Sequence, residues 1–240
     1  MATAEKYQEL TNVYHLPEMW GKHRVFQDRF QAGEVLAEML CKFRNTHFLI
    51  LGIPAGGVPV ASVIASRLGL DLDLAVVSKI TLPWDTEAGY GAVAFDGTTR
   101  LNRMLADRLR LDEETIKDGI RKTTQKVNRR NTTLRGEKPF PELSGRSVIL
   151  VDDGLASGFT MLTAVDAVAK NHATEIFVAV PTGQLRSIER LAGEVNGIFC
   201  PNIRSSMAFA VADAYENWTD VSENEVIAVL EKERRYLPGT

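Results

Sequence analysis

The chain has 240 residues, of which 45% are hydrophobic and 25% charged, as in soluble globular proteins, and this length suits one α/β domain over residues 1–240. A net charge of −3 gives no reason to expect binding to nucleic acid or to an anionic membrane. The polar start MATAEKYQEL, with no apolar run near the ~20 residues that span a bilayer, predicts a cytoplasmic protein. Cys41 and Cys200 have no metal-site spacing and are expected to be ordinary reduced thiols.

The first half of the chain alternates helices and strands. Apolar residues at helical spacing predict a helix over Asp28–Arg44, and the apolar run Phe48–Ile53 predicts a strand. The loop PAGG, residues 54–57, leads into a helix over Pro59–Leu68 that has proline in its first turn. Leu72–Ile80 predicts the next strand, so this part should form a right-handed βαβ unit.

A hairpin and a long helix come next. Asp96-Gly97, flanked by the apolar segments Ala92–Phe95 and Thr98–Leu101, is typical of a β-hairpin turn. A helical pattern then covers about Asp112–Arg135 and carries seven basic residues. A basic helix could attract phosphate or nucleic acid, but acids elsewhere balance its charge, which favours a solvated helix face.

The second half repeats the alternation. Val148–Val151 and Glu175–Val180 predict buried strands, Gln184–Leu191 predicts a helix, and Val195–Cys200 predicts a last short strand. Ser222 with Glu225 forms a capping box that opens a helix to about Glu233. The fold class predicted is therefore α/β, with a mostly parallel sheet, helices on both faces, and ligands beyond the carboxyl ends of the strands.

The most informative stretch is SVILVDDGLASGFT, residues 147–160. A buried strand ends in Asp152 and Asp153, and a loop of small residues then enters a helix. Backbone N–H groups at a helix start lack intrahelical partners and favour an anion such as phosphate. Two carboxylates would repel a phosphate by themselves, so we expect them to accept hydrogen bonds from sugar hydroxyls or to share Mg²⁺ with a pyrophosphate.

VILVDDGLASGFTM resembles the signature of the type I phosphoribosyltransferases, which bind 5-phosphoribosyl 1-pyrophosphate (PRPP). The resemblance implies that Asp152 and Asp153 contact the ribose and take part in binding Mg²⁺. It implies a twisted, mostly parallel sheet with a small hood, and a homodimer. It assigns the 5′-phosphate to the loop residues Leu155, Ala156, Ser157, Gly158, Phe159 and Thr160. The competing interpretation is an ordinary βα turn with two solvated acids.

Other segments resemble one group of this family, the stand-alone predicted phosphoribosyltransferases of bacteria and archaea. They are FQDRFQAG from Phe26, the loop 54–57 in place of P-R-G-G, and PWDTEAGYGAV from Pro83. The resemblance implies that Ala55, Gly56 and Gly57 bind pyrophosphate and that Lys79, at the predicted strand end, neutralises it as it leaves. A plain βα turn and a surface lysine are the competing interpretations.

The chain departs from this pattern at two positions. Ala55 and Ser78 stand where the group has arginines, whose planar donor forks suit phosphate. Pyrophosphate binding would then depend on backbone N–H groups, Lys79, metal or a distant arginine. The candidates for that arginine are Arg24, Arg29, Arg100 and Arg103.

Phosphoribosyltransferases also have a flexible lid and a variable hood that holds the base. The lid candidate is Trp84–Gly91, from which Glu87 and Tyr90 could reach the substrate. The hood would combine the N-terminal segment with about residues 201–220, including the stretch from Met207 to Trp218, where Tyr215 or Trp218 could stack on a base. Ordinary loop or core packing is the competing interpretation for each of these side chains.

The function expected from these features is transfer of phosphoribose from PRPP, with Mg²⁺, to a nitrogen acceptor such as a nucleobase, with release of pyrophosphate. A non-catalytic regulatory protein that binds PRPP or a nucleotide is the alternative, and the missing arginines motivate it. A phosphate-ester hydrolase has less support, because the sequence offers no obvious nucleophile–base set and no Walker lysine. The acceptor base is not encoded in any motif of the chain.

Overall fold

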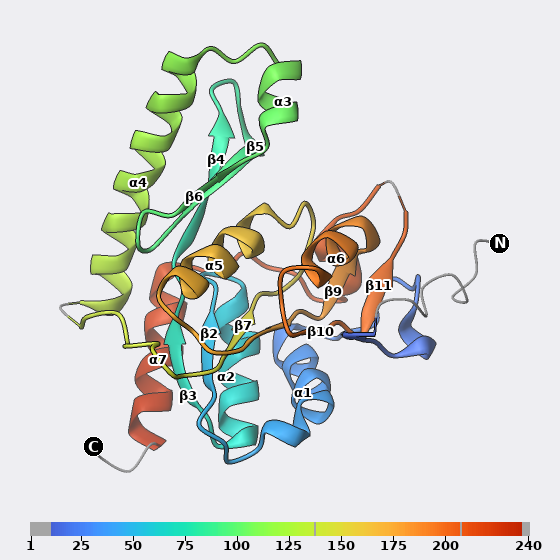
Figure 1. The fold of residues 1–240 in the computed structure, drawn as a ribbon. Coiled ribbons are helices and arrows are strands. Elements are labelled where there is room, and N and C mark those ends of the chain that lie inside the picture. Colours follow the sequence, from blue (N-terminus) through green and yellow to red (C-terminus); the bar gives the residue numbers. More distant parts are fainter. Residues whose placement is uncertain (1–10, 137, 207, 237–240) are drawn as a thin grey trace.

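The computed structural model describes residues 11–136, 138–206 and 208–236. Within these residues the central layer is a six-stranded parallel sheet with the order β1-β10-β8-β7-β2-β3 (Figure 1). Its strands are β1 (Val13–Tyr14), β2 (Leu49–Gly52), β3 (Asp71–Leu74), β7 (Val148–Val151), β8 (Ile176–Ala179) and β10 (Gly197–Phe199). None of the helices in these residues combines the length and the apolar character needed to cross a bilayer.

Helices cover both faces of this sheet, which confirms the predicted fold class. Strands β2, β7 and β8 are buried along their whole length, as continuous apolar runs require. On one face Ile50 and Ile149 pack with residues of the first two helices, and on the other Leu51 and Leu150 pack with residues of the later two. The two pairs are α1 (Arg29–Met39) with α2 (Gly57–Leu68), and α5 (Phe159–Lys170) with α6 (Leu185–Ala192).

An arm projects beyond the carboxyl edge of the sheet (Figure 1). It is a three-stranded antiparallel sheet with two helices. Its elements are β4 (Val77–Leu82), β5 (Asp85–Ala94), β6 (Thr99–Leu101), α3 (Arg103–Arg108) and α4 (Glu113–Arg135). The predicted hairpin at Asp96-Gly97 is confirmed, since Gly97 has φ +84° and the N–H of Ala94 donates to the carbonyl of Thr98.

One strand prediction in this region is wrong. The single strand predicted over Leu72–Ile80 is two strands in different sheets, β3 and β4. The apolar run from Leu74 to Val77 is buried through the connection as well as in both strands, so the pattern hides the break. The lid candidate Trp84–Gly91 forms part of the β4–β5 turn and the first seven residues of β5, and its role as a lid stays a prediction. Tyr90 is fully buried against Ile80 and Gly119, as the core-packing interpretation expected, and the side chain of Glu87 lies outside the described residues.

The helix ends follow their capping residues. Asp28 caps α1 by accepting from the N–H of Gln31, but this helix stops at Met39 and a 3₁₀ turn, η3 (Cys41–Phe43), replaces the predicted last turn. Asp112 caps α4, and the predicted capping box opens α7 (Glu223–Tyr236). The basic face of α4 is not wholly solvated. Arg135 is buried and forms an ion pair with Asp73 of β3, a contact that no sequence pattern predicts.

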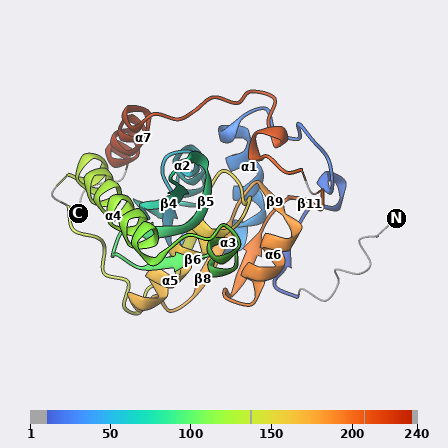
Figure 2. The same ribbon diagram turned by 90° about the horizontal axis from the view of Figure 1, so that it is seen from above.

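A second small region joins the N-terminal segment to residues 202–218 (Figure 2). Val25 donates its N–H to the carbonyl of Ala214, and Glu216 donates to the carbonyl of Phe26. The segments involved are η2 (Pro17–Met19), η4 (Val211–Ala214) and the two-stranded parallel sheet of β9 (Thr182–Gln184) with β11 (Asn202–Arg204). The two predicted hood segments therefore lie together, although Met207 falls outside the described residues.

Candidate functional site

The acid pair and the PAGG loop meet at the carboxyl edge of the sheet. They follow the neighbouring strands β7 and β2, whose last residues Val151 and Gly52 pair with each other. The approach is close: a Cβ atom placed on Gly56 would lie 1.9 Å from Oδ2 of Asp153. A Cβ on Gly57 would lie 2.7 Å from Cα of Asp152, so both glycines are needed for the two loops to touch.

Asp153 is held firmly in this arrangement. Nε of Arg29 donates to Oδ2 of Asp153 at 2.9 Å, and the side chains of this ion pair are 8% and 16% exposed respectively. The hydroxyl of Tyr215 donates to the main-chain carbonyl of Asp153 at 2.6 Å. Both the carboxylate and the backbone of Asp153 are thus fixed by residues far away in the sequence.

Asp152 has a different environment. Its Oδ1 accepts the N–H of Asp153 at 2.9 Å, and no described lysine or arginine pairs with it. Burial and the neighbouring carboxylate of Asp153 raise the pKa of Asp152 well above its usual range. Burial also raises the pKa of Asp153, but the Arg29 guanidinium opposes this shift. Asp152 is therefore the carboxylate that a cation or a hydroxyl donor would stabilise most.

The loop after the acid pair is anchored by its carbonyl groups. Ser187 donates its hydroxyl to the carbonyl of Ala156 at 2.5 Å, and Arg190 donates to the carbonyl of Ser157 at 3.1 Å. Gly158, with φ +80°, is the N-cap of α5. No described residue accepts a hydrogen bond from the backbone N–H groups of residues 156–160, so this helix start offers them to an anion.

Leu155 differs from the rest of the predicted phosphate loop. Its side chain is buried, and its N–H donates to the carbonyl of Thr182 at 2.8 Å as part of a bridge to Gly183. Leu155 therefore has neither a free N–H nor an exposed side chain for a ligand. The candidate phosphate-binding N–H groups are therefore those of residues 156–160, and Leu155 connects this loop to β9.

The PAGG loop needs a similar correction. Gly57 is the first residue of α2, and its N–H already donates to the carbonyl of Ile53 at 3.1 Å. Its contribution is the close approach to Asp152, not an amide for the ligand. The N–H groups of Ala55 and Gly56 have no acceptor among the described residues, and both residues are half-buried.

Lys79 does not end a strand of the central sheet. It lies inside β4, opposite Ala92, and is exposed on the face that also carries Val77 and Ala92, which belong to the core cluster of α5. Ser78 points to the opposite face and is buried in the arm. An arginine at position 78 would likewise point into the arm. Serine at this position therefore removes no positive charge from the face that carries Lys79.

Of the four candidate arginines, Arg29 is the one that contacts the acid pair. Arg100 of β6 pairs with Asp166 of α5 and with Glu194, and Arg103 pairs with Glu113 at the surface. Arg24 is exposed and its N–H donates to the carbonyl of Asp213. The sequence singles out the segment that holds Arg29, but Arg29 and Asp153 are 124 positions apart in the sequence, so no local pattern reveals their contact.

The two hood aromatics belong to the same cluster. Tyr215 is buried, which supports the core-packing interpretation for this residue, and its ring lies 5.2 Å from that of Trp218. One face of Trp218 is covered by the Arg29 guanidinium, which lies 3.8 Å from the ring centroid. Sequence reasoning missed the role of Tyr215 as a hydrogen-bond donor to the backbone of Asp153.

The donor set at the acid pair fits Mg²⁺ shared with a substrate. Magnesium is usually bound through one or two carboxylates together with substrate phosphates, rather than in a cage of protein ligands. Among the described residues there is no cluster of three or more His, Cys, Asp and Glu side chains that would make such a cage. Asp152 is the more available metal ligand of the pair, because no arginine or lysine among the described residues forms an ion pair with it.

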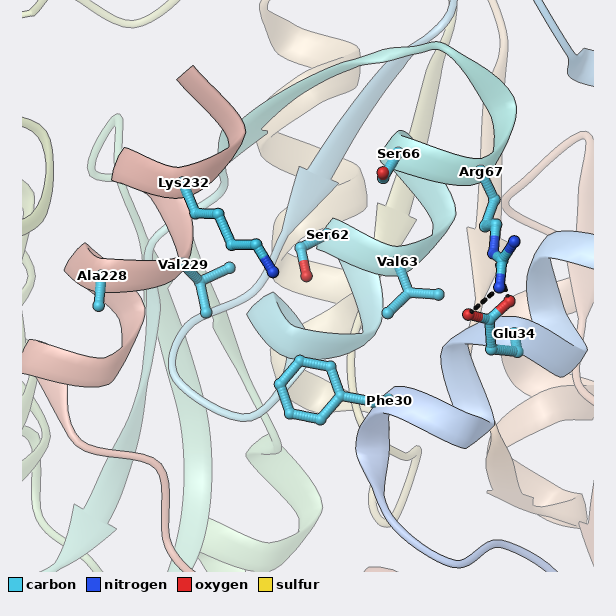
Figure 3. Close-up of a pocket in the computed structure, with 9 residues that line it drawn as sticks. All are labelled: Phe30, Glu34, Ser62, Val63, Ser66, Arg67, Ala228, Val229 and Lys232. Carbon is cyan, nitrogen blue, oxygen red and sulfur yellow. Dashed lines mark hydrogen bonds and ion pairs between the residues drawn. The ribbon is translucent and has the colours of Figure 1, made fainter. Parts of the chain in front are cut away.

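Two cavities lie on the α1–α2 face. Figure 3 shows the first, of about 490 Å³, between α1, α2 and α7, with Phe30, Val63 and Val229 among its lining. The second, of about 410 Å³, shares Phe30 and Val229 and reaches Arg29 and Thr219. The acid pair lines neither cavity, so their volumes do not describe the candidate site.

Comparisons with known proteins identify the family of this chain. A Mycobacterium tuberculosis (strain H37Rv) protein named "Putative phosphoribosyl transferase Rv0571c" is 34% identical over 212 residues, 88% of this chain and 48% of that protein. The chain thus spans about half the length of the curated relatives it matches. The crystal structure of TT1426 from Thermus thermophilus superposes with a TM-score of 0.70 at 31% identity, covering 86% of this chain and 98% of that one. The family model "Phosphoribosyl transferase domain" matches residues 96–216, which include the acid pair and the loop 154–160 but not the PAGG loop. The chain therefore belongs to the phosphoribosyl transferase domain family.

Proposed function

We propose that this protein binds PRPP together with Mg²⁺ and transfers its phosphoribosyl group to a nitrogen of a small acceptor, a nucleobase being the acceptor class that fits best. The observation that carries the proposal is the meeting of two carboxylates with two sets of unpartnered backbone N–H groups at the ends of β2 and β7. A phosphorylated sugar with a pyrophosphate at the other end needs both kinds of group. An ordinary βα turn would not need the close approach of Gly56 and Gly57.

The acid pair would hold the ribose. Asp152 and Asp153 would accept hydrogen bonds from the ribose hydroxyls, with Asp153 fixed by Arg29 and Asp152 free to take a ligand. Asp152 is also the residue proposed to hold Mg²⁺, with Asp153 beside it. When bound, the metal would neutralise charge on the pyrophosphate.

The two loops would hold the two ends of PRPP. The N–H groups of residues 156–160 would bind the 5′-phosphate at the start of α5. Those of Ala55 and Gly56 would bind the pyrophosphate, and Lys79, on the arm face directed to the α5 core, would add positive charge.

The chemical step breaks the bond between C1′ and the pyrophosphate oxygen and forms a bond between C1′ and the acceptor nitrogen. The electron pair of the broken bond leaves with the pyrophosphate, and the acceptor nitrogen loses its proton. Positive charge develops on the ribose ring beside the acid pair. Positioning and electrostatic stabilisation would supply most of the rate, without a covalent enzyme intermediate.

The acceptor side and the assembly belong to the same proposal. The acceptor would lie under the hood formed by the N-terminal segment and residues 201–220, where Trp218 offers an aromatic ring. As the family resemblance implies, the protein would act as a homodimer in the cytoplasm, with small molecules rather than nucleic acid or membranes as partners.

The test is an activity assay with PRPP, Mg²⁺ and a panel of nucleobases, in which the release of pyrophosphate is measured. Asp107→Asn, which changes an exposed carboxylate, is the matched control for Asp152→Asn. Base-dependent pyrophosphate release that Asp152→Asn abolishes supports the proposal. PRPP binding without turnover for any base would instead support a regulatory PRPP-binding protein, the alternative that Ala55 in place of arginine favours.

A further inference from the structure

Arg29 connects two parts of the molecule that are far apart in the sequence. Its Nε donates to the carboxylate of Asp153 at 2.9 Å, and its Nη1 donates to the main-chain carbonyl of Thr219 at 2.7 Å. Its guanidinium also lies 3.8 Å from the ring centroid of Trp218. One buried side chain therefore contacts the acid pair and the segment 215–219 at the same time.

A second hydrogen bond links the same segment to Asp153 rather than to Asp152. Tyr215, in the same segment, donates its hydroxyl to the backbone carbonyl of Asp153 at 2.6 Å. Gly56 also packs against the Asp153 carboxylate, closest to the Oδ2 atom that accepts from Arg29, so this carboxylate has little room to move without displacing Arg29. Asp152 has no such links to the segment.

The residue type suits this task. The planar guanidinium donates in several fixed directions and stacks on aromatic rings, whereas a lysine ammonium is a point charge on a flexible stem. Lysine at this position could keep a positive charge beside Asp153. It could not at the same time make the bond to the Thr219 carbonyl and the stacking contact with Trp218 in this geometry.

We propose that Arg29 is a positioning residue that couples sugar binding at the acid pair to the order of segment 215–219. This inference rests on the proposed function, because it takes PRPP as the ligand of Asp153. A sugar that fixes the Asp153 carboxylate also fixes Arg29, and Arg29 then holds the Thr219 carbonyl and the Trp218 ring. Occupancy of the ribose site is thereby transmitted to the side of the site where the acceptor would bind.

The test compares PRPP affinity with amide hydrogen exchange in the full chain. Suitable probes are the N–H groups of Glu216 and Asn217, which donate to the carbonyls of Phe26 and Gln27. In the unaltered protein, PRPP with Mg²⁺ should slow their exchange. Arg29→Gln should weaken PRPP binding by about tenfold or more, because the charge beside Asp153 is lost.

Arg29→Lys separates positioning from charge. It should bind PRPP within about threefold of the unaltered protein, since an ammonium still pairs with Asp153. PRPP should nevertheless no longer slow exchange at Glu216 and Asn217. The matched control is Arg67→Gln, which removes an arginine from an exposed ion pair with Glu34 and should change neither reading.

Two results would overturn the inference alone: unchanged PRPP affinity in Arg29→Gln, or full PRPP-dependent protection of the two amides in Arg29→Lys. If Arg29→Gln does not fold, the lysine variant decides, because it retains the ion pair. Failure of the unaltered chain to bind PRPP at all would instead remove the proposed function, and this inference with it.

Discussion

The loop 54–57 after β2 and the loop 154–160 after β7 lie side by side at the carboxyl edge of the sheet, yet different contacts shape them. The first is defined by what is missing: Gly56 and Gly57 have no room for a side chain beside the acid pair. The second is defined by what holds it, since β9 and α6 bond to the backbone of Leu155, Ala156 and Ser157.

Backbone N–H groups are thus left without acceptors among the described residues in two different ways. Close approach to the acid pair fixes the PAGG loop without hydrogen-bond donors from other elements. The loop 154–160 is instead held by donors from β9 and α6, which bond to its carbonyl groups. Atoms added at Gly56 or Gly57 should therefore damage the first loop, and deleted donors should damage the second. Four substitutions test this contrast, from the largest expected effect to the smallest.

Gly57→Ala should destabilise the protein by about 3 kcal/mol, because the new Cβ would lie 2.6 Å from the carbonyl oxygen of Val151. The two nearest atoms belong to the backbone, which cannot move aside as a flexible side chain can. Chemical denaturation measures the effect. The control is Gly193→Ala, where a Cβ meets nothing within 4 Å and the change should stay within about 0.5 kcal/mol. Equal stability of the two variants would show that the loops do not touch as described.

Asp152→Asn should weaken PRPP binding by about a hundredfold, because it removes a charged acceptor, yet raise the free energy of unfolding at pH 7. The pKa of Asp152 is raised in the folded state, so the folded chain holds more protons than the unfolded chain between the ordinary and the raised value. Stability of the unaltered protein should therefore fall as the pH rises through that window.

Calorimetric titration with PRPP and denaturation at several pH values check both parts of this prediction. In Asp152→Asn the fall in stability over that pH window should be much reduced. Asp107→Asn, at an exposed position, serves as the control and should leave binding and stability as they are. A variant at position 152 that binds PRPP normally would contradict the role given to the acid pair.

Ser187→Ala should weaken binding of both PRPP and ribose 5-phosphate by about fivefold, since it removes the 2.5 Å bond that anchors Ala156. Ser62→Ala is the matched control, because the Ser62 hydroxyl is also buried and donates to a carbonyl, that of Pro59 in its own helix. The prediction fails if Ser62→Ala weakens both ligands as much as Ser187→Ala does.

Ala55→Arg should strengthen PRPP binding by about threefold, because it adds a planar donor fork next to the free N–H groups of the PAGG loop. Ribose 5-phosphate, which lacks the pyrophosphate, should bind as before and provides the internal control. A gain for both ligands would place position 55 near the 5′-phosphate, contrary to the roles given to the two loops.

The sequence predicts what is local in this molecule. Strand β7, the acid pair and the start of α5 are contiguous, and so are β2, the PAGG loop and α2, so their patterns place both halves of the site at the same sheet edge. The capping residues Asp28, Asp112 and Ser222 mark helix starts for the same reason: their hydrogen bonds reach only three residues along the chain.

What the sequence could not reveal depends on distant contacts. Arg29 and Tyr215 reach Asp153 across 124 and 62 residues, and neither bond leaves a pattern in the chain. Strands of two or three residues, such as β1, β9 and β11, are too short to show a period. The separation of β3 from β4 was missed because the end of β3, the connection and the start of β4 form one buried apolar run, Leu74–Val77.

One ion pair of the arm has a mechanical consequence. Arg135, in the last turn of α4, is buried beside Asp73, and Arg130 pairs with Glu223 of α7. The last turns of α4 are thereby fastened to β3 and α7, while its first turns lie near the β4–β5 turn at the far end of the arm (Figure 1). Any swing of the arm would pivot at these last turns and carry Lys79 along with it.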